Sequence, residues 1–289
     1  MAKLRVGIAQ IRSTDDPWEN LLTVQSMVDE ARREKVEFLC FPENVFYRGP
    51  KRSPKGAQRS EVHLRRDAEG RLAPHSDFSR ALAECLAAWP MTVSLGSVLE
   101  ETPDGELPYN AHWVVRPGVP IDTYRKIHLF VFESATATYR ETDDVRAGET
   151  PVVVDVGGFR AGLSICFDLR FPELFRREAV GMGANMLLIP AAFTRETGEA
   201  HWHTLLRARA VENLSFVVAA GQWGSHFDAK GTELWCYGHS LIIDPWGRVL
   251  AEGPAEGDAL VVADVDTAEA EARRAKLPVY PSVRLLDQG

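Results

Sequence analysis

The stretch Leu163-Ser164-Ile165-Cys166-Phe167-Asp168-Leu169-Arg170-Phe171-Pro172-Glu173 decides the fold class and indicates the chemistry. The apolar run that ends at Ile165 predicts a buried strand, and Pro172 predicts the first turn of a helix. Cys166 therefore lies in a strand-to-helix turn, which lifts a side chain out of the sheet toward a cavity. The free N–H groups at the helix start favour a thiolate and an oxyanion. We interpret Cys166 as a nucleophile; the alternative is a small buried side chain.

Two further charged residues follow predicted strands. The buried run 36–41 stops at Pro42-Glu43-Asn44, and a predicted hairpin that joins 111–115 to 121–125 is followed directly by Lys126. A thiol nucleophile needs a base and a group that stabilises the oxyanion, and Glu43 and Lys126 have the right chemistry for these roles. A single Glu or Lys after a strand is more often an exposed, solvated charge. The interpretation therefore rests on Glu43, Lys126 and Cys166 together.

The remaining chain alternates short apolar runs with helical patterns, which is typical of an α/β protein. We expect helices at 17–35, 78–88 and 200–213 and a helix of about ten residues opened by Pro172. We expect strands at 4–11, 92–99, 152–156, 160–165, 185–190, 216–220, 240–244 and 248–252. Residues 48–76 are rich in Arg, Lys, Gly and Pro and show no apolar period, which predicts a long surface loop.

Composition limits the possible functions. The chain has 289 residues, 45% of them apolar, and the motifs are spread over its whole length, so we expect one domain over residues 1–289. A net charge of -8 argues against nucleic-acid binding, and no apolar run is long enough to span a membrane. The N-terminus has no signal-peptide core, and the four cysteines form no CxxC pair, so we expect a cytoplasmic protein without a zinc site or disulfides.

Three motifs in the same order resemble the three signatures of the nitrilase (carbon-nitrogen hydrolase) superfamily. They are Phe41-Pro42-Glu43, Tyr124-Arg125-Lys126-Ile127-His128-Leu129-Phe130 and the stretch from Cys166 to Glu173. The likeness begins at Val6 and ends near Pro278, so it covers nearly the whole chain. The segments 198–210 and 237–240 are most similar to the small-amide branch that includes ω-amidase and deaminated glutathione amidase.

The resemblance implies a four-layer αββα sandwich, paired with a second subunit as a homodimer or higher oligomer, and a Glu43-Lys126-Cys166 triad. It also implies a second active-site glutamate, for which Glu141 is the best match and Glu133 the competitor. The backbone N–H of Phe167 would join Lys126 in the oxyanion hole. No metal or organic cofactor is required.

The implied reaction is hydrolysis of a carboxamide C–N bond in a small, acidic amide. Glu43 takes the proton of Cys166, the thiolate attacks the amide carbon, ammonia or an amine leaves, and water hydrolyses the thioester. The alternatives are a nitrilase or N-carbamoyl amidohydrolase of the same superfamily and a scaffold without turnover.

Three assignments stay open at this level. His128 lies two positions beyond Lys126 and is an alternative base in a Cys-His arrangement. Thr194 and Arg195 follow a predicted strand beside the nucleophile and are candidates for substrate binding. The guanidinium of Arg195 is a candidate clamp for a substrate carboxylate, although it fits an ion pair with Glu196 or Glu199 equally well. A metal site would have to use His201, His203, His226, Cys236 and His239, for which we favour packing or hydrogen-bonding roles.

Overall fold

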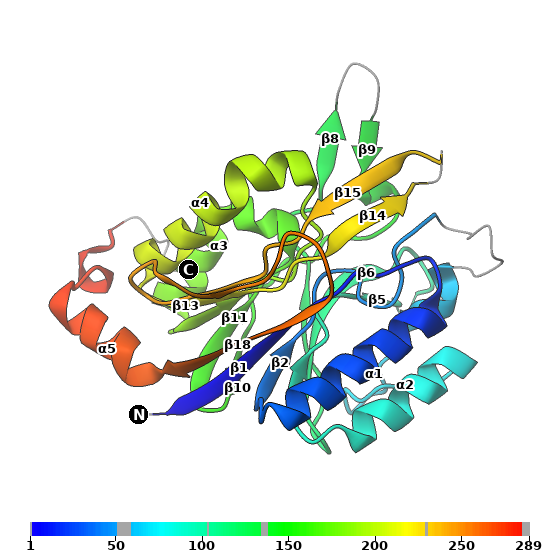
Figure 1. Cartoon of the computed structure of the whole chain (residues 1–289), viewed down its shortest axis with the longest axis horizontal. Coiled ribbons are helices and arrows are strands. Elements are labelled where there is room, and N and C mark those ends of the chain that lie inside the picture. The colour runs from blue at the N-terminus through cyan, green and yellow to red at the C-terminus, as the bar shows by residue number, and fades with distance from the viewer. Residues whose placement is uncertain (1, 51–58, 103, 134–137, 229–230, 285–289) are drawn as a thin grey trace.

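Two β-sheets lie face to face between two layers of helices in the computed structural model (Figure 1). The structure describes residues 2–50, 59–102, 104–133, 138–228 and 231–284. This is the four-layer αββα sandwich that the resemblance to the nitrilase superfamily implies. Among the residues described, none of the helices combines the length and the apolar character needed to cross a membrane.

The first sheet has eight strands, and its N-terminal strands β1, β2 and β4 run parallel. Its order is β18 (Ala259–Asp266), β1 (Lys3–Gln10), β2 (Phe38–Cys40), β4 (Thr92–Ser94), β6 (Tyr109–Val115), β5 (Val98–Glu100) and β3 (His63–Leu64), with β7 (Asp122–Arg125) also paired to β6. The helices α1 (Pro17–Arg33) and α2 (Asp77–Ala88) cover its outer face (Figure 1).

The second sheet has six strands, and β11, β12 and β13 run parallel. Its order is β10 (Val153–Val156), β11 (Phe159–Leu163), β12 (Met186–Leu188), β13 (Phe216–Ala219), β16 (Leu241–Ile243) and β17 (Val249–Glu252). Its outer face is covered by α3 (Pro172–Arg176) and α4 (Arg195–Asn213) (Figure 1).

Smaller elements complete the fold. They are the strand pairs β8 (Val131–Glu133) with β9 (Thr138–Arg140) and β14 (Trp223–Phe227) with β15 (Glu233–Tyr237), the helix α5 (Thr267–Lys276), the 3₁₀ turns η1 (Arg59–Val62), η2 (Glu141–Asp143), η3 (Cys166–Arg170) and η5 (Tyr280–Ser282), and the π-helical turn η4 (Arg177–Gly181).

The alternation of side chains along a strand builds two separate cores. On β2, Phe38 and Cys40 point into the core between the two sheets, whereas Leu39 and the following Phe41 point into the core under α1 and α2. Because every second residue faces the same side, a strand that is buried on both faces must be apolar at almost every position. The continuous apolar run before Pro42 is therefore a consequence of its central place in the sandwich.

Two predicted elements differ from the structure. The strand expected at 92–99 is broken into β4 and β5 at Gly96, whose φ is +63° and whose missing Cβ would stand 2.1 Å from the carbonyl oxygen of Pro42. Only glycine allows the chain to pass so close to the Pro42-Glu43 turn. The segment 48–76 is also more than a loop: it supplies the edge strand β3, which pairs with β5, while residues 51–58 lie outside the described part.

Candidate active site

Glu43 lies just beyond the end of β2 and is 5% exposed. Its Oε1 accepts hydrogen bonds from Nζ of Lys126 at 2.9 Å and from Nδ2 of Asn110 at 3.1 Å. Its Oε2 accepts from the backbone N–H of Ala192 at 3.0 Å. Both carboxylate oxygens are thus held in place by donors from three separate segments of the chain.

Lys126 is one of the most deeply buried polar residues, with 1% of its surface exposed at the end of β7. Its Nζ lies 2.9 Å from Oε1 of Glu43 and 2.9 Å from Oε2 of Glu141. A buried ammonium group needs such partners, because loss of hydration without compensation would remove its charge. Two glutamates were considered for the second acidic position. Glu141 is the one that contacts the lysine. Glu133 ends β8, and its side chain lies outside the described part.

Asn110 joins the two carboxylates and is a residue that the sequence reasoning missed. Its Nδ2 donates to Oε1 of Glu43 at 3.1 Å and to Oε1 of Glu141 at 2.9 Å, and its backbone oxygen accepts from Lys126 N at 2.9 Å. The available signal was an amide side chain directly before the predicted strand 111–115, since a buried polar group needs a hydrogen-bond partner.

Cys166 begins the 3₁₀ turn η3 with a φ of +48°, which is unusual for a residue with a Cβ. The predicted turn is therefore present and strained. Asp168, which is fully buried, holds this turn: its Oδ2 accepts from the N–H of Ile165 and from the hydroxyl of Tyr124, both at 2.8 Å. The strain at Cys166 is maintained by surrounding hydrogen bonds, as expected where a side chain must be presented at a set position.

The segment after β12 ties Cys166 to Glu43. The backbone N–H of Cys166 donates to the carbonyl oxygen of Pro190 at 2.8 Å, and two residues later the N–H of Ala192 donates to Glu43. The thiol and the carboxylate lie close enough that each group changes the pKa of the other. Cys166 is partly exposed, whereas Glu43 and Lys126 are buried.

The charges around the site determine whether Cys166 or Glu43 holds the proton before the reaction starts. Burial alone would raise the pKa of Glu43, but Lys126 holds it below its ordinary value. Burial would lower the pKa of Lys126, yet Glu43 and Glu141 raise it well above its usual range. Desolvation and the Glu43 carboxylate raise the pKa of the Cys166 thiol, and Lys126 opposes them. The site therefore rests as a neutral thiol beside a carboxylate that is able to accept its proton.

His128 is engaged away from this group. Its Nδ1 lies 2.7 Å from Oδ1 of Asp168, and its ring stacks on that of Phe171 with the centroids 3.7 Å apart. Because Asp168 also receives the Ile165 N–H and the Tyr124 hydroxyl, His128 belongs to the hydrogen-bond network that supports the Cys166 turn.

The predicted substrate-binding pair lies at the start of α4. Thr194 caps this helix, and its Oγ1 accepts from the N–H of Thr197 at 3.4 Å. Arg195 Nη2 donates to Glu256 at 2.6 Å, and its guanidinium lies 4.4 Å from the ring centroid of Trp235. The partner of Arg195 is thus Glu256, and neither Glu196 nor Glu199 pairs with it in the described part.

Two other arginines lie near the thiol and its base, and the sequence reasoning did not select them. Arg170, in η3, contacts His201 at 3.2 Å and the ring of Phe193 at 5.1 Å, and it has no carboxylate partner among the described residues. The buried Nε of Arg48 likewise has no hydrogen-bond partner there, and the positive charge of Arg48 lowers the pKa of Glu43. The available signal was position in the sequence: Arg170 lies within the motif that begins at Cys166, and Arg48 follows the Phe41-Pro42-Glu43 motif by five residues.

The histidines of the alternative metal reading are distributed over different contacts. His201 faces Arg170, while His203 faces Glu252, so these two side chains diverge as their spacing on the helix predicts. Cys236 is buried, and burial lowers the pKa of His226 to about 3. His203 does meet His239, through Glu252, a residue that the sequence reading had not included.

Known proteins resemble this chain over nearly its whole length. The model of the carbon-nitrogen hydrolase family matches residues 5–275. A deaminated glutathione amidase from Dictyostelium discoideum is 36% identical and is aligned over 97% of this chain and 94% of its own, and the human protein of that name is 35% identical, over 95% and 80%.

Solved structures of related proteins have the same fold as this chain. The NitFhit protein of C. elegans, at 31% identity, superposes with a TM-score of 0.81 over 98% of this chain and 66% of its own. An amidase from Nesterenkonia sp. AN1, solved with acrylamide added to its active-site cysteine, is 25% identical with a TM-score of 0.71, over 95% and 98% of the two chains. The chain therefore belongs to the carbon-nitrogen hydrolase family and is an amidase of the nitrilase superfamily.

Proposed function

We propose that this enzyme hydrolyses a small carboxamide through a thioester on Cys166, with Glu43 as the general base and Lys126 as the oxyanion-stabilising cation. The observation that carries the proposal is the buried ion-paired group of Lys126, Glu43 and Glu141 beside the strained Cys166 turn. A buried cation held at 2.9 Å from each of two carboxylates is kept at a set position without free rotation, which is the preorganisation that charge stabilisation needs.

The reaction starts when Glu43 accepts the Cys166 proton and the sulfur forms a bond to the amide carbon. The negative charge that develops on the amide oxygen faces Lys126 and the backbone N–H of Phe167. The C–N bond then breaks, and the leaving nitrogen takes the proton from Glu43. Water next attacks the thioester while Glu43 accepts its proton; the C–S bond then breaks, the sulfur takes that proton back from Glu43, and the carboxylic acid leaves as the Cys166 thiol is restored.

Glu141 has a supporting part in this scheme. Its Oε2 accepts hydrogen bonds from Lys126 and from the N–H of Phe130 at 2.7 Å, so it orients the lysine and anchors the segment after it. A second carboxylate also keeps Lys126 charged when Glu43 becomes neutral by taking the thiol proton.

We further propose that the acyl part of the substrate carries a carboxylate. Arg170 follows Cys166 by four residues in η3, and desolvation lowers the pKa of its guanidinium. Neither Arg170 nor the Nε of Arg48 has an acidic partner in the described residues, whereas a partly buried guanidinium is most stable opposite a carboxylate. An acidic amide would supply that missing partner.

Arg195 remains a third candidate for the same contact, and the test separates the three. Arg170→Met or Arg48→Met should raise KM for acidic amides at least tenfold more than for neutral amides, about 1.4 kcal/mol of selective binding. Arg195→Met should do so only if its guanidinium leaves Glu256 for the substrate. Equal changes for acidic and neutral amides in all three variants would reject an acidic substrate.

The function is tested by ammonia release from a panel of amides, nitriles and carbamoyl compounds. Amides should be hydrolysed, Cys166→Ala should be inactive with an unchanged circular dichroism spectrum, and acid-quenched wild type should carry an acyl group on Cys166 by mass spectrometry. Turnover of nitriles or carbamoyl compounds alone would reject the proposed carboxamide substrate in favour of the alternative reactions of the superfamily.

We also propose a homodimer in a reducing compartment such as the cytoplasm. Exposed apolar side chains on α4, on the β16–β17 turn and at the start of β17 support a protein contact there; they are Val211, Trp246 and Val249. All four cysteines are free thiols, as a reducing environment requires. Sedimentation equilibrium of the wild type and of Val211→Glu should give a dimer and a monomer, respectively.

A further inference from the structure

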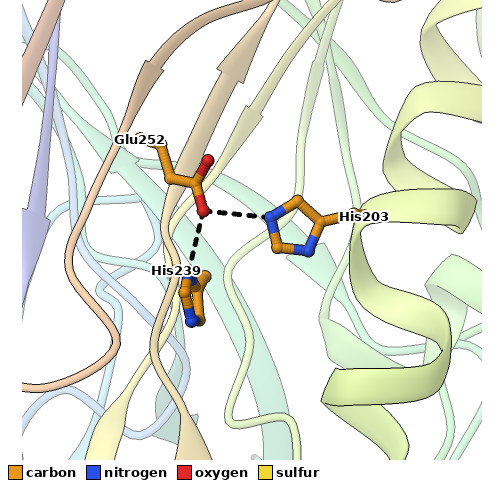
Figure 2. Close-up of side chains that lie close together, drawn as sticks. All are labelled: His203, His239 and Glu252. Atoms are coloured by element: carbon orange, nitrogen blue, oxygen red, sulfur yellow. Dashed lines mark hydrogen bonds and ion pairs between the residues drawn. The ribbon is translucent and has the colours of Figure 1, made fainter.

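We propose that His203, His239 and Glu252 bind one divalent transition-metal ion, with zinc as the representative, at a site separate from the proposed catalytic group. Figure 2 shows the three side chains converging from different parts of the chain. His203 comes from α4, His239 lies two residues after β15, and Glu252 ends β17. Two imidazoles and one carboxylate are a ligand set that zinc and related metals accept.

The distances fit a coordination sphere. Oε1 of Glu252 lies 2.8 Å from Nδ1 of His239 and 3.0 Å from Nε2 of His203, and the three ligand atoms lie within 4.8 Å of one another. Ligand atoms bound to a tetrahedral zinc ion at about 2.0–2.2 Å stand about 3.3 Å apart. The two nitrogen–oxygen distances are already close to this spacing, so an ion can take the place of the hydrogen bonds between these atoms.

The backbone around His239 is held in place. This residue has a φ of +50°, its carbonyl oxygen accepts the indole N–H of Trp202 at 2.7 Å, and the ring of Tyr237 lies 4.5 Å from its imidazole, centroid to centroid. A ligand whose orientation is already determined loses little entropy when the metal binds. Trp202 and His203 are neighbours on α4, so the same helix positions both histidines.

The side chains of the cluster reach solvent. Their exposed fractions are 35% for His203, 24% for His239 and 39% for Glu252, so a metal ion can enter and a water molecule can complete a fourth position. Without a metal, the same contacts are two histidine–glutamate hydrogen bonds. A metal site and a hydrogen-bonded cluster are therefore distinguished by measuring whether a metal binds.

The chemistry proposed above uses none of these three residues, so metal binding rather than turnover is the informative measurement. The full-length protein should be titrated calorimetrically with Zn²⁺ in a Cys166→Ala background, because the thiol of Cys166 would itself bind zinc. We expect one equivalent of zinc to bind. His203→Ala and Glu252→Gln should each weaken this binding at least tenfold.

A matched control is available in the same chain. His75 and Glu101 form a partly exposed histidine–glutamate pair, with the nitrogen 3.6 Å from the oxygen. His75→Ala should bind zinc as tightly as the parent. If the parent shows no saturable binding, or if His203→Ala and Glu252→Gln bind as the parent does, the cluster is a hydrogen-bonded pair of histidines and the proposal is wrong. Glu252→Gln keeps the size of the side chain, so it tests the site even if His203→Ala does not fold.

Discussion

Replacing Lys126 by methionine tests the central feature of the site, the buried cation between two carboxylates. Methionine keeps an unbranched chain of similar length but removes the charge and the donors to Glu43 and Glu141. If Lys126 stabilises the oxyanion, kcat should fall by about 10²–10³, which is about 2.7–4 kcal/mol of transition-state stabilisation. KM should change less, because the charge develops only in the transition state.

The same substitution should change the pH dependence of stability. Breaking a buried ion pair by removing one partner costs about 3–5 kcal/mol. In the wild type, the pKa of Glu43 lies below its ordinary value, so the ion pair contributes fully above about pH 4.5 and is lost as the pH falls below that value. In Lys126→Met, the Glu141 carboxylate should raise the pKa of Glu43 instead, so the variant should lose stability as the pH rises above about 4.5. The difference in Tm between wild type and variant should therefore be smaller at pH 5 than at pH 8.

The assays are steady-state ammonia release and thermal unfolding followed by circular dichroism at both pH values. Lys3→Met is the matched control, since Lys3 is 85% exposed and lies 3.9 Å from its carboxylate partner; it should leave kcat and both Tm values nearly unchanged. A Lys126→Met enzyme that folds normally and keeps more than a tenth of the wild-type kcat would refute the oxyanion role.

Three further predictions follow from individual contacts. His128→Ala should retain a substantial fraction of kcat, because the imidazole is bonded to Asp168 and stacked on Phe171; a dead, folded variant would restore the Cys-His reading. Asn110→Ala should lower kcat by about 10–100-fold, which corresponds to the free energy of a hydrogen bond to a charged group. An unchanged rate would show that Lys126 alone positions both carboxylates. Glu178 is fully buried, neither of its carboxyl oxygens has a hydrogen-bond partner in the described residues, and burial raises its pKa well above the ordinary value. The unfolded form ionises above about pH 4.5, whereas burial opposes ionisation in the folded form. Glu178→Gln should therefore stabilise the protein more at pH 8 than at pH 5 in urea unfolding, and an equal effect at both pH values would contradict this.

Much of the fold could be predicted from the sequence because its signals are local. The apolar runs before Pro42 and Cys166 are found as β2 and β11, and Pro17 opens α1 over Pro17–Arg33. The helix expected at 200–213 begins earlier, at Arg195, because Thr194 caps it. The strands β14, β15 and β18 and the helix α5 were not predicted, since their patterns are too weak without the neighbours they pair with.

The sequence by itself determined which residues stand just after the predicted strands. Strand, turn and helix signals depend on neighbours a few positions away, so Glu43, Lys126 and Cys166 could be selected before any contact was known. The resemblance to the carbon-nitrogen hydrolases, which the family match confirms, was carried by the same three short motifs.

Only the tertiary structure decided which partners these residues meet. Lys126 and His128 were indistinguishable by spacing. In the structure Lys126 contacts Glu43 and Glu141, whereas His128 contacts Asp168 of η3. Asn110 joins two carboxylates that lie 67 and 31 positions away in the chain. Arg195 finds Glu256, and His203 finds Glu252, across similar separations. The physical reason is that strand order and sheet packing bring distant residues together, whereas periodicity along the chain specifies only the face of an element on which a side chain lies.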